Sequence, residues 1–187
     1  MPEGTGGFVC QTCQGRDFAF EYAVSPYQCR GVLRDLVHRF KYQRQLFLSP
    51  LLGRLLSDVM QDERLQALGQ DWMTVPVPLH ARRYREREFN QAQELCREFR
   101  ERCGIPCVNA LKRTRYTSSQ TRYQRKQRME NLRGAFVLRR RKAKHIDGRT
   151  VALVDDVFTT GSTANECARV LLASGAKNVV VITLARG

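Results

Sequence analysis

Apolar residues recur along this chain in blocks that predict alternating strands and helices. Residues 179–184 are apolar almost throughout, as expected of a parallel strand covered on both faces. A second apolar run, Val151 to Val154, comes shortly before it and predicts another buried strand. Between the two runs, helical spacing places five apolar side chains on one face, namely Ala164, Cys167, Ala168, Leu171 and Leu172. This strand–helix–strand order predicts an α/β protein with a mostly parallel sheet.

The earlier part of the chain repeats this alternation with shorter elements. Helical spacing covers three segments, 31–46, 49–68 and a stretch from 83 or 89 to 104. Strand patterns cover 72–77, 106–111 and 135–138, and residues 16–28 predict a short strand or hairpin. Residues 139–145 read as a basic turn. The sequence Thr163-Ala164-Asn165-Glu166 matches a capping box, in which Thr163 begins the last helix.

A length of 187 residues suffices for one domain with a sizeable core. No window holds 18 consecutive apolar residues, so no membrane insertion is expected. Residues 1–20 lack a basic start followed by an apolar stretch, which argues against a secretory signal. A cytoplasmic protein is therefore the default expectation.

The net charge of +14 is concentrated in one third of the chain. Residues 82–144 hold 20 Lys or Arg and 6 Asp or Glu, whereas the remainder holds 12 of each. Such a block attracts polyanions, so pyrophosphate, phosphorylated sugars and nucleic acid are all candidate partners. A solvated basic face without a ligand is the alternative interpretation.

Seven cysteines are present, and two of them have zinc-ligand spacing. Cys10 and Cys13 form one CxxC pair, but a structural zinc site needs four ligands and no second close pair follows. Cys29 and His38 are available as further ligands, although their spacing does not argue for it. We expect an incomplete zinc site, and no disulfide framework in a protein without a secretory signal.

The strongest chemical signal follows the strand that ends at Val154. Asp155 and Asp156 are adjacent carboxylates, and a loop of hydroxyls around a glycine comes next, Thr159-Thr160-Gly161-Ser162-Thr163. A helix N-terminus offers N–H groups and a positive dipole end to a phosphate. Carboxylates beside it can accept hydrogen bonds from ribose hydroxyls or bind Mg²⁺ directly or through water. The alternative is a strand-to-helix turn whose acids only cap the helix.

The run Val-Asp-Asp-Val-Phe-Thr-Thr-Gly-Ser-Thr (154–163) resembles the phosphoribosyl-pyrophosphate (PRPP) motif of type I phosphoribosyltransferases. Further segments are similar to the ComF family of competence-type, phosphoribosyltransferase-like proteins, which includes ComFC and GntX. These segments are His38-Arg39-Phe40-Lys41-Tyr42, Val75-Pro76-Val77-Pro78-Leu79-His80, Phe89-Asn90-Gln91-Ala92, Arg113-x-Arg115-x-Thr117-x-x-Gln120, Arg128-x-x-Asn131, Ala135-Phe136 and Leu184-Ala185-Arg186. The resemblance extends from about residue 30 to residue 187.

This resemblance implies a type I phosphoribosyltransferase fold, a mostly parallel Rossmann-like sheet flanked by helices. Residues 1–30 would be an N-terminal segment with a remnant CxxC, and 31–187 the phosphoribosyltransferase-like domain. Within that domain, 31–70 would form a helical hood and 71–187 the core. Family members usually begin with two CxxC pairs, so the single pair here implies weak or no zinc binding, through true loss or a start codon placed downstream.

The resemblance also implies roles for single residues. Asp155 and Asp156 would bind the ribose hydroxyls of PRPP with Mg²⁺ nearby, and residues 159–163 would hold its 5′-phosphate. Segment 112–128 would be a mobile loop that closes over PRPP. Two sets of residues would surround the pyrophosphate: Pro78, Leu79, His80, Arg82 and Arg83 from one turn, and Arg113, Arg115 and Arg122 from the mobile loop.

Two functions follow from the resemblance and the charge. The first is PRPP–Mg²⁺ binding, with transfer of phosphoribose to an unidentified acceptor; the sequence leaves catalysis itself open. The second is a non-catalytic competence or DNA-utilisation protein, working with the DNA-uptake machinery, that binds single-stranded DNA through basic residues interleaved with Tyr84, Tyr116 and Tyr123. His38 and Lys41 share a helix face. The first interpretation is that this face is solvated, and the alternative is that it faces the acceptor.

Overall fold

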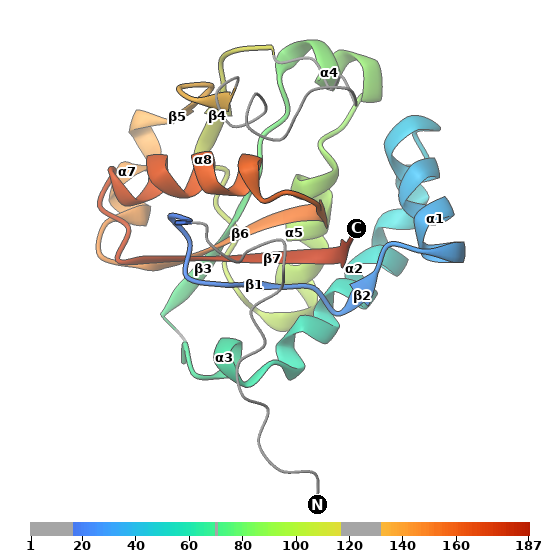
Figure 1. Ribbon diagram of the computed structural model, residues 1–187, viewed down its shortest axis with the longest axis horizontal. Coiled ribbons are helices and arrows are strands. Elements are labelled where there is room, and N and C mark those ends of the chain that lie inside the picture. The colour runs from blue at the N-terminus through green and yellow to red at the C-terminus, as the bar shows by residue number, and fades with distance from the viewer. Residues whose placement is uncertain (1–16, 70, 117–131) are drawn as a thin grey trace, which may run out of the picture.

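A parallel sheet forms the centre of the molecule, with strand order β1-β7-β6-β3 and β2 also paired with β7 (Figure 1). The computed structural model describes residues 17–69, 71–116 and 132–187. The strands of the central sheet are β1 (Ala23–Val24), β2 (Tyr27–Gln28), β3 (Trp72–Pro76), β6 (Thr150–Phe158) and β7 (Asn178–Arg186). A second, antiparallel sheet pairs β4 (Leu111–Arg113) with β5 (Phe136–Leu138).

Helices cover both faces of the central sheet (Figure 1). They are α1 (Gly31–Tyr42), α2 (Ser49–Ser57), α3 (Glu63–Gln66), α4 (Ala81–Arg87), α5 (Gln91–Cys103), α7 (Ala143–Ile146) and α8 (Ser162–Leu172). Short 3₁₀ turns occupy Leu46–Leu48, Asp58–Gln61 and Arg140–Lys142. In the described ranges, no helix combines the length and apolarity needed to cross a membrane.

Two hydrophobic clusters, one on each face of the sheet, hold these layers together. Along β6, Val151 and Leu153 pack with α8, whereas Ala152 and Val154 pack with α2 and α5. All four side chains are fully buried, which explains why the strand reads as an uninterrupted apolar run. The α/β prediction from this run is confirmed.

Several predicted boundaries changed in the structure. Of the two alternatives predicted over 16–28, the short strand is confirmed by β1 and β2, and the hairpin is wrong because both strands run parallel to β7. The predicted 106–111 strand reduces to a bridge between Cys107 and Thr74, followed by β4. The 31–46 helix ends at Tyr42, and the basic turn at 139–145 folds into a 3₁₀ turn and α7.

Two predicted helices are broken by local backbone geometry. Asp62 is extended, and its carboxylate accepts from the Arg64 N–H at 3.0 Å, so a new helix begins there instead of one helix reaching residue 68. Glu88 has φ of +70°, and Asn90 then caps α5, which separates α4 from α5. The capping box at 163–166 is also wrong: Gly161 is the N-cap, and the Glu166 carboxylate accepts from the Gly134 N–H at 2.6 Å.

Some sequence predictions concern residues outside the described ranges. The CxxC pair Cys10 and Cys13 is among them, as are Arg122 and Tyr123 of the predicted mobile loop. The hood and core division at residue 70 remains a prediction.

Candidate functional site

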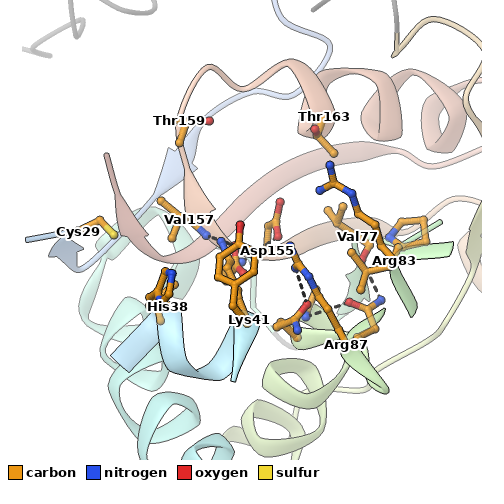
Figure 2. A pocket seen from close by; sticks show the side chains of 18 of the residues that line it. Cys29, His38, Lys41, Val77, Arg83, Arg87, Asp155, Val157, Thr159 and Thr163 are labelled. Atoms are coloured by element: carbon orange, nitrogen blue, oxygen red, sulfur yellow. Dashed lines mark hydrogen bonds and ion pairs between the residues drawn. The ribbon is translucent and has the colours of Figure 1, made fainter. Parts of the chain in front are cut away.

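A cavity of about 450 Å³ opens where β6 ends, between the 159–163 loop, α1 and the α4–α5 segment. Figure 2 shows Asp155 in its centre, Thr159 and Thr163 at one end, and His38, Lys41 and Arg87 at the other. This position agrees with the general tendency of ligands to bind beyond the carboxyl ends of parallel strands. Parallel pairing of β6 with β7 continues through Asp155 and Thr183, so both acids are held on a regular strand rather than on a loop.

The two adjacent acids differ in environment. Asp156 is 6% exposed, and its Oδ1 accepts from the Lys41 ammonium at 2.8 Å. Burial raises the pKa of Asp155 from its ordinary 3.8 to about 7, and the neighbouring Asp156 carboxylate adds to this shift. The Lys41 charge lowers the pKa of Asp155 and so offsets part of this rise. The site therefore carries negative charge that a further cation would stabilise.

Lys41 reaches this pair from α1, more than a hundred residues earlier in the sequence. Burial lowers its pKa, but the Asp156 carboxylate and the hydrogen bond to it raise the pKa by more. The solvated-face interpretation of this helix is thus wrong for Lys41, whose side chain is 19% exposed. His38 lines the same cavity, with its ring centre 4.8 Å from that of Tyr42.

The 159–163 loop leads into α8 with the geometry of an anion-binding turn. Gly161 has φ of +73°, and a Cβ there would come within 2.9 Å of the Phe158 ring, so the position requires glycine. No side chain of Gly161 can cap the helix, and the Thr160 and Ser162 hydroxyls lie 3.0 Å apart. A smaller hollow of about 60 Å³ is lined by all five loop residues. The N-terminus of α8 and its dipole therefore face a small polar hollow.

Arginine side chains line the cavity beside the Pro78–Leu79 turn. Arg83 and Arg113 both contribute to the lining. Burial lowers the pKa of Arg113, and the nearby Arg83 charge lowers it further. Two like charges held together in a partly buried cavity favour a polyanion between them.

Three residues of the predicted site lie elsewhere. Among the described residues, His80, Arg82 and Arg115 do not line the cavity. The His80 ring accepts from the Arg82 N–H at 3.2 Å and thereby caps α4. The Arg82 guanidinium lies over the Tyr116 ring, 4.8 Å from its centre.

Sequence reasoning missed part of the cavity wall. Arg34, Tyr42 and Arg87 line it, and none of them was assigned a role. Asn90 and Gln91 line it as well; Asn90 also caps α5, and its side-chain amide donates to the Val77 carbonyl at 3.0 Å. The available signals were the clusters at 38–42 and 89–92, which resemble family motifs, but nothing in them indicated which side chains face inward.

Direct metal coordination has few protein donors here. In the described ranges, no group of three or more His, Cys, Asp or Glu side chains is placed to hold a metal ion. Asp155 and Asp156 are two carboxylates at one place, which is the number that Mg²⁺ commonly takes from a protein when a phosphorylated ligand supplies the rest.

Comparison with known proteins assigns a family to this arrangement. Residues 89–187 match the family model described as "Phosphoribosyl transferase domain". Competence protein F of Haemophilus influenzae is 39% identical over 156 residues, which cover 82% of this chain and 68% of that protein. DNA utilization protein YhgH of Escherichia coli K12 is 34% identical over 190 residues, covering 100% of this chain and 81% of that one.

A solved structure gives a weaker match. The glutamine PRPP amidotransferase from B. subtilis, complexed with ADP and GMP, is 20% identical with a TM-score of 0.45. The match covers 73% of this chain and 26% of the amidotransferase chain.

Proposed function

Because the chain belongs to the phosphoribosyl transferase domain family, and within it to the ComF-type competence and DNA-utilisation proteins, we propose that it binds PRPP together with Mg²⁺. The observation that carries this proposal is the junction of β6 and α8. There, the two carboxylates line one cavity with Arg83, Arg113, Thr159 and Thr163, and the complete 159–163 loop lines a smaller hollow that shares Asp155 with it. A ribose with a phosphate on one side and a pyrophosphate on the other matches each of these groups.

Each part of PRPP has a candidate partner. The 5′-phosphate would lie at the N-terminus of α8, with residues 159–163 around it. The ribose hydroxyls would donate to Asp155 and Asp156. The pyrophosphate would lie between the 78–79 turn and the Arg83–Arg113 pair, and the Arg82 and Arg115 side chains would approach it only after a rearrangement.

The donor set fits magnesium. Burial and the neighbouring carboxylate raise the pKa of Asp155, so a cation near it would relieve unfavourable charge. Asp155 and Asp156 would hold the ion directly or through water, and PRPP oxygens would supply further ligands. When bound, magnesium would neutralise charge on the pyrophosphate group. Cys10 and Cys13 lie outside the described residues, and zinc binding remains an expectation of weak or no affinity.

Transfer of phosphoribose is the reaction that this arrangement supports. The bond between ribose C1 and the pyrophosphate oxygen breaks, and pyrophosphate leaves with the electron pair. A bond forms between C1 and the acceptor, which releases a proton to water. Arg83 and Arg113 would stabilise the negative charge that develops on the departing group.

The proposal is tested by removing both acids. Replacing Asp155 and Asp156 by Asn should abolish PRPP–Mg²⁺ binding in calorimetry, because the ribose hydroxyls and the cation lose their acceptors. The matched control replaces two exposed acids, Asp17 and Asp35, by Asn and should bind PRPP as the unmodified protein does. Unchanged binding by the Asp155 and Asp156 variant, with a native circular dichroism spectrum, would refute the site.

A second candidate function is binding of single-stranded DNA. The observation that favours it is an exposed basic surface at 139–144, which continues the charge excess of segment 82–144. Tyr84 and Tyr116 belong to the same basic segment of the sequence and are 49% and 42% exposed, which leaves the Tyr84 ring and the face of the Tyr116 ring away from Arg82 as candidates for base stacking. The names of the relatives associate them with competence and DNA utilisation. The two functions are compatible if PRPP acts as a regulatory ligand.

A further inference from the structure

The cavity has a cationic wall that PRPP would leave unused. Its lining includes five Lys or Arg residues and two Asp residues. Lys41 is paired with Asp156, and Arg83 and Arg113 lie on the side proposed for pyrophosphate. Two arginines then remain, Arg34 on α1 and Arg87 on α4. Figure 2 shows Arg87 entering the cavity on the side away from Thr159 and Thr163.

Arg87 is held in place by neutral partners. Its guanidinium donates to the Gln91 side-chain carbonyl at 3.0 Å and lies 5.0 Å from the centre of the Tyr42 ring. Within the described part of the chain, neither contact supplies a negative charge. Arg87 is therefore positioned and half-buried while its charge is uncompensated. An arginine in this condition favours an anion that can take bidentate hydrogen bonds.

Gln91 supplies an independent observation. It is 2% exposed and lines the cavity, and its side-chain nitrogen is buried with no hydrogen-bond partner among the described residues. The bond from Arg87 to the Gln91 oxygen fixes which end of the amide is the donor. A buried donor without an acceptor destabilises the folded protein, so it is usually explained by a ligand or a water.

Apolar groups complete this wall. Val37, Val77 and Ala92 are buried and line the cavity beside Arg87 and Gln91. A ligand here would therefore meet an apolar surface along its body and two N–H donors at its head. The ring of Tyr42, at the outer edge, already has Arg87 over it and His38 beside it.

We propose that Arg87 and Gln91, with Arg34 at the entrance, form the acceptor subsite, and that the acceptor carries a carboxylate or phosphate group on an apolar body. This inference rests on the proposed function, since it assigns the part of the cavity that PRPP would not fill. Arg87 lies one helical turn beyond Arg83 on α4, so an acceptor held on this wall would lie next to the part of the cavity proposed for pyrophosphate.

The subsite is tested with small aromatic probes on protein saturated with PRPP–Mg²⁺. Benzoate and benzamide have the same shape and differ in charge, and phenyl phosphate distinguishes a phosphate-bearing acceptor from a carboxylate-bearing one. In ¹⁵N-detected NMR titrations, benzoate or phenyl phosphate should bind about tenfold more tightly than benzamide. Equal affinities, or no binding by any of the three, would overturn the proposal.

Variants localise the effect. Arg87→Gln should reduce the preference for the anion to within about twofold while leaving PRPP affinity unchanged. Gln91→Glu, which places a carboxylate where the amide nitrogen lies, should remove anion binding. Arg85→Gln, at an exposed position of the same helix outside the cavity lining, is the matched control and should behave as the unmodified protein.

The same titrations separate this inference from the proposed function. If PRPP–Mg²⁺ fails to bind but the anion preference persists and depends on Arg87, the subsite stands and the PRPP assignment falls. If PRPP–Mg²⁺ binds and the anion preference is absent or is unaffected by Arg87→Gln, the subsite assignment falls and the PRPP assignment stands.

Discussion

At the scale of single residues, Asp155 carries a stability cost that its proposed ligand would relieve. Its carboxyl ordinarily titrates near 3.8, and desolvation by the protein around this half-buried side chain raises the pKa to about 7 in the folded protein. Between these values the folded protein binds a proton that the unfolded chain has released. The free energy of unfolding therefore falls as the pH rises from about 4 to about 7, and stays lower above 7. Sites that must bind a cation commonly carry such a cost.

Replacing this acid should therefore stabilise the protein without ligand. Asp155→Asn removes the charge and keeps the shape, so it should raise the free energy of unfolding at pH 8 by about 1–3 kcal/mol. The gain should shrink towards pH 4, where the native carboxyl is protonated. Urea denaturation across this pH range measures it, with the exposed Asp35→Asn as control. A variant less stable than the unmodified protein at pH 8 would contradict the assigned pKa.

The Lys41–Asp156 ion pair makes the opposite prediction. Lys41→Met leaves the Asp156 carboxylate, 8% exposed, without its counter-charge and should lower the free energy of unfolding by about 2–3 kcal/mol. The double variant with Asp156→Asn removes both charges and should recover most of that loss. Thermal or urea denaturation gives the coupling energy, and exposed Lys177→Met is the control. Additive effects of the two changes would show that the pair contributes no stability.

How far the sequence predicts this site depends on the distance between its parts along the chain. The acids and the 159–163 loop lie within nine residues, so their spacing alone indicates a sugar phosphate. Lys41, Arg87 and Gln91 reach the cavity only through packing of α1 and the α4–α5 segment against the sheet. The inward face of a helix is visible in a sequence when it is apolar, whereas a cationic inward face looks like a solvated one.

At the scale of elements, buried strands were predicted well and helix ends poorly. The apolar runs of β6 and β7 follow directly from burial on both faces. By contrast, Glu88 adopts a left-handed conformation that is uncommon for a residue other than glycine, so the end of α4 gave no compositional signal. Parallel pairing of β1 and β2 with one strand likewise depends on contacts far apart in sequence.

The contact between α2 and α5 depends on one glycine. A Cβ at Gly53 would lie 2.2 Å from the Glu98 Cβ, which is attached directly to the α5 backbone and cannot move away alone. Gly53→Ala gains about 1 kcal/mol in helix propensity. It forces the helices apart at a cost of about 1–3 kcal/mol, and the severity of this overlap favours the upper part of that range.

We therefore expect Gly53→Ala to lower the free energy of unfolding by about 1–2 kcal/mol, despite alanine being the better helix former. Urea denaturation measures this change. Arg54→Ala, at the adjacent exposed position, is the control and should be neutral within about 0.5 kcal/mol. An unchanged or raised stability of Gly53→Ala would mean that α2 can shift on α5 without loss of packing.

At the scale of the whole molecule, one basic segment carries the entire net charge, and the remainder of the chain is neutral overall. The segment 82–144 contributes to the cavity through Arg83, Arg87 and Arg113 and continues on the surface at 139–144. A cavity for a phosphorylated sugar needs only a few of its 20 basic residues. The surplus is a reason to keep the nucleic-acid function beside the PRPP function, since neutralising phosphates along a strand uses many cations at once.

The surplus makes a prediction that the PRPP site alone does not. If single-stranded DNA binds along this segment, its affinity should fall steeply with salt, because each neutralised phosphate releases a counterion. Changing Arg122, Arg125 and Lys126 to Gln should then weaken binding and reduce the slope of log K against log salt by about 2, at about 0.7 per contact. Fluorescence anisotropy with a labelled oligonucleotide measures both quantities.

The control isolates position from net charge. Arg54, Arg169 and Lys177 are exposed basic residues outside the segment, and changing them to Gln lowers the net charge by the same three units. If binding follows the basic segment, this triple variant should keep nearly the affinity and salt slope of the unmodified protein. Equal losses in the two triple variants would mean that DNA responds only to overall charge, and the segment would then have no role as a binding surface.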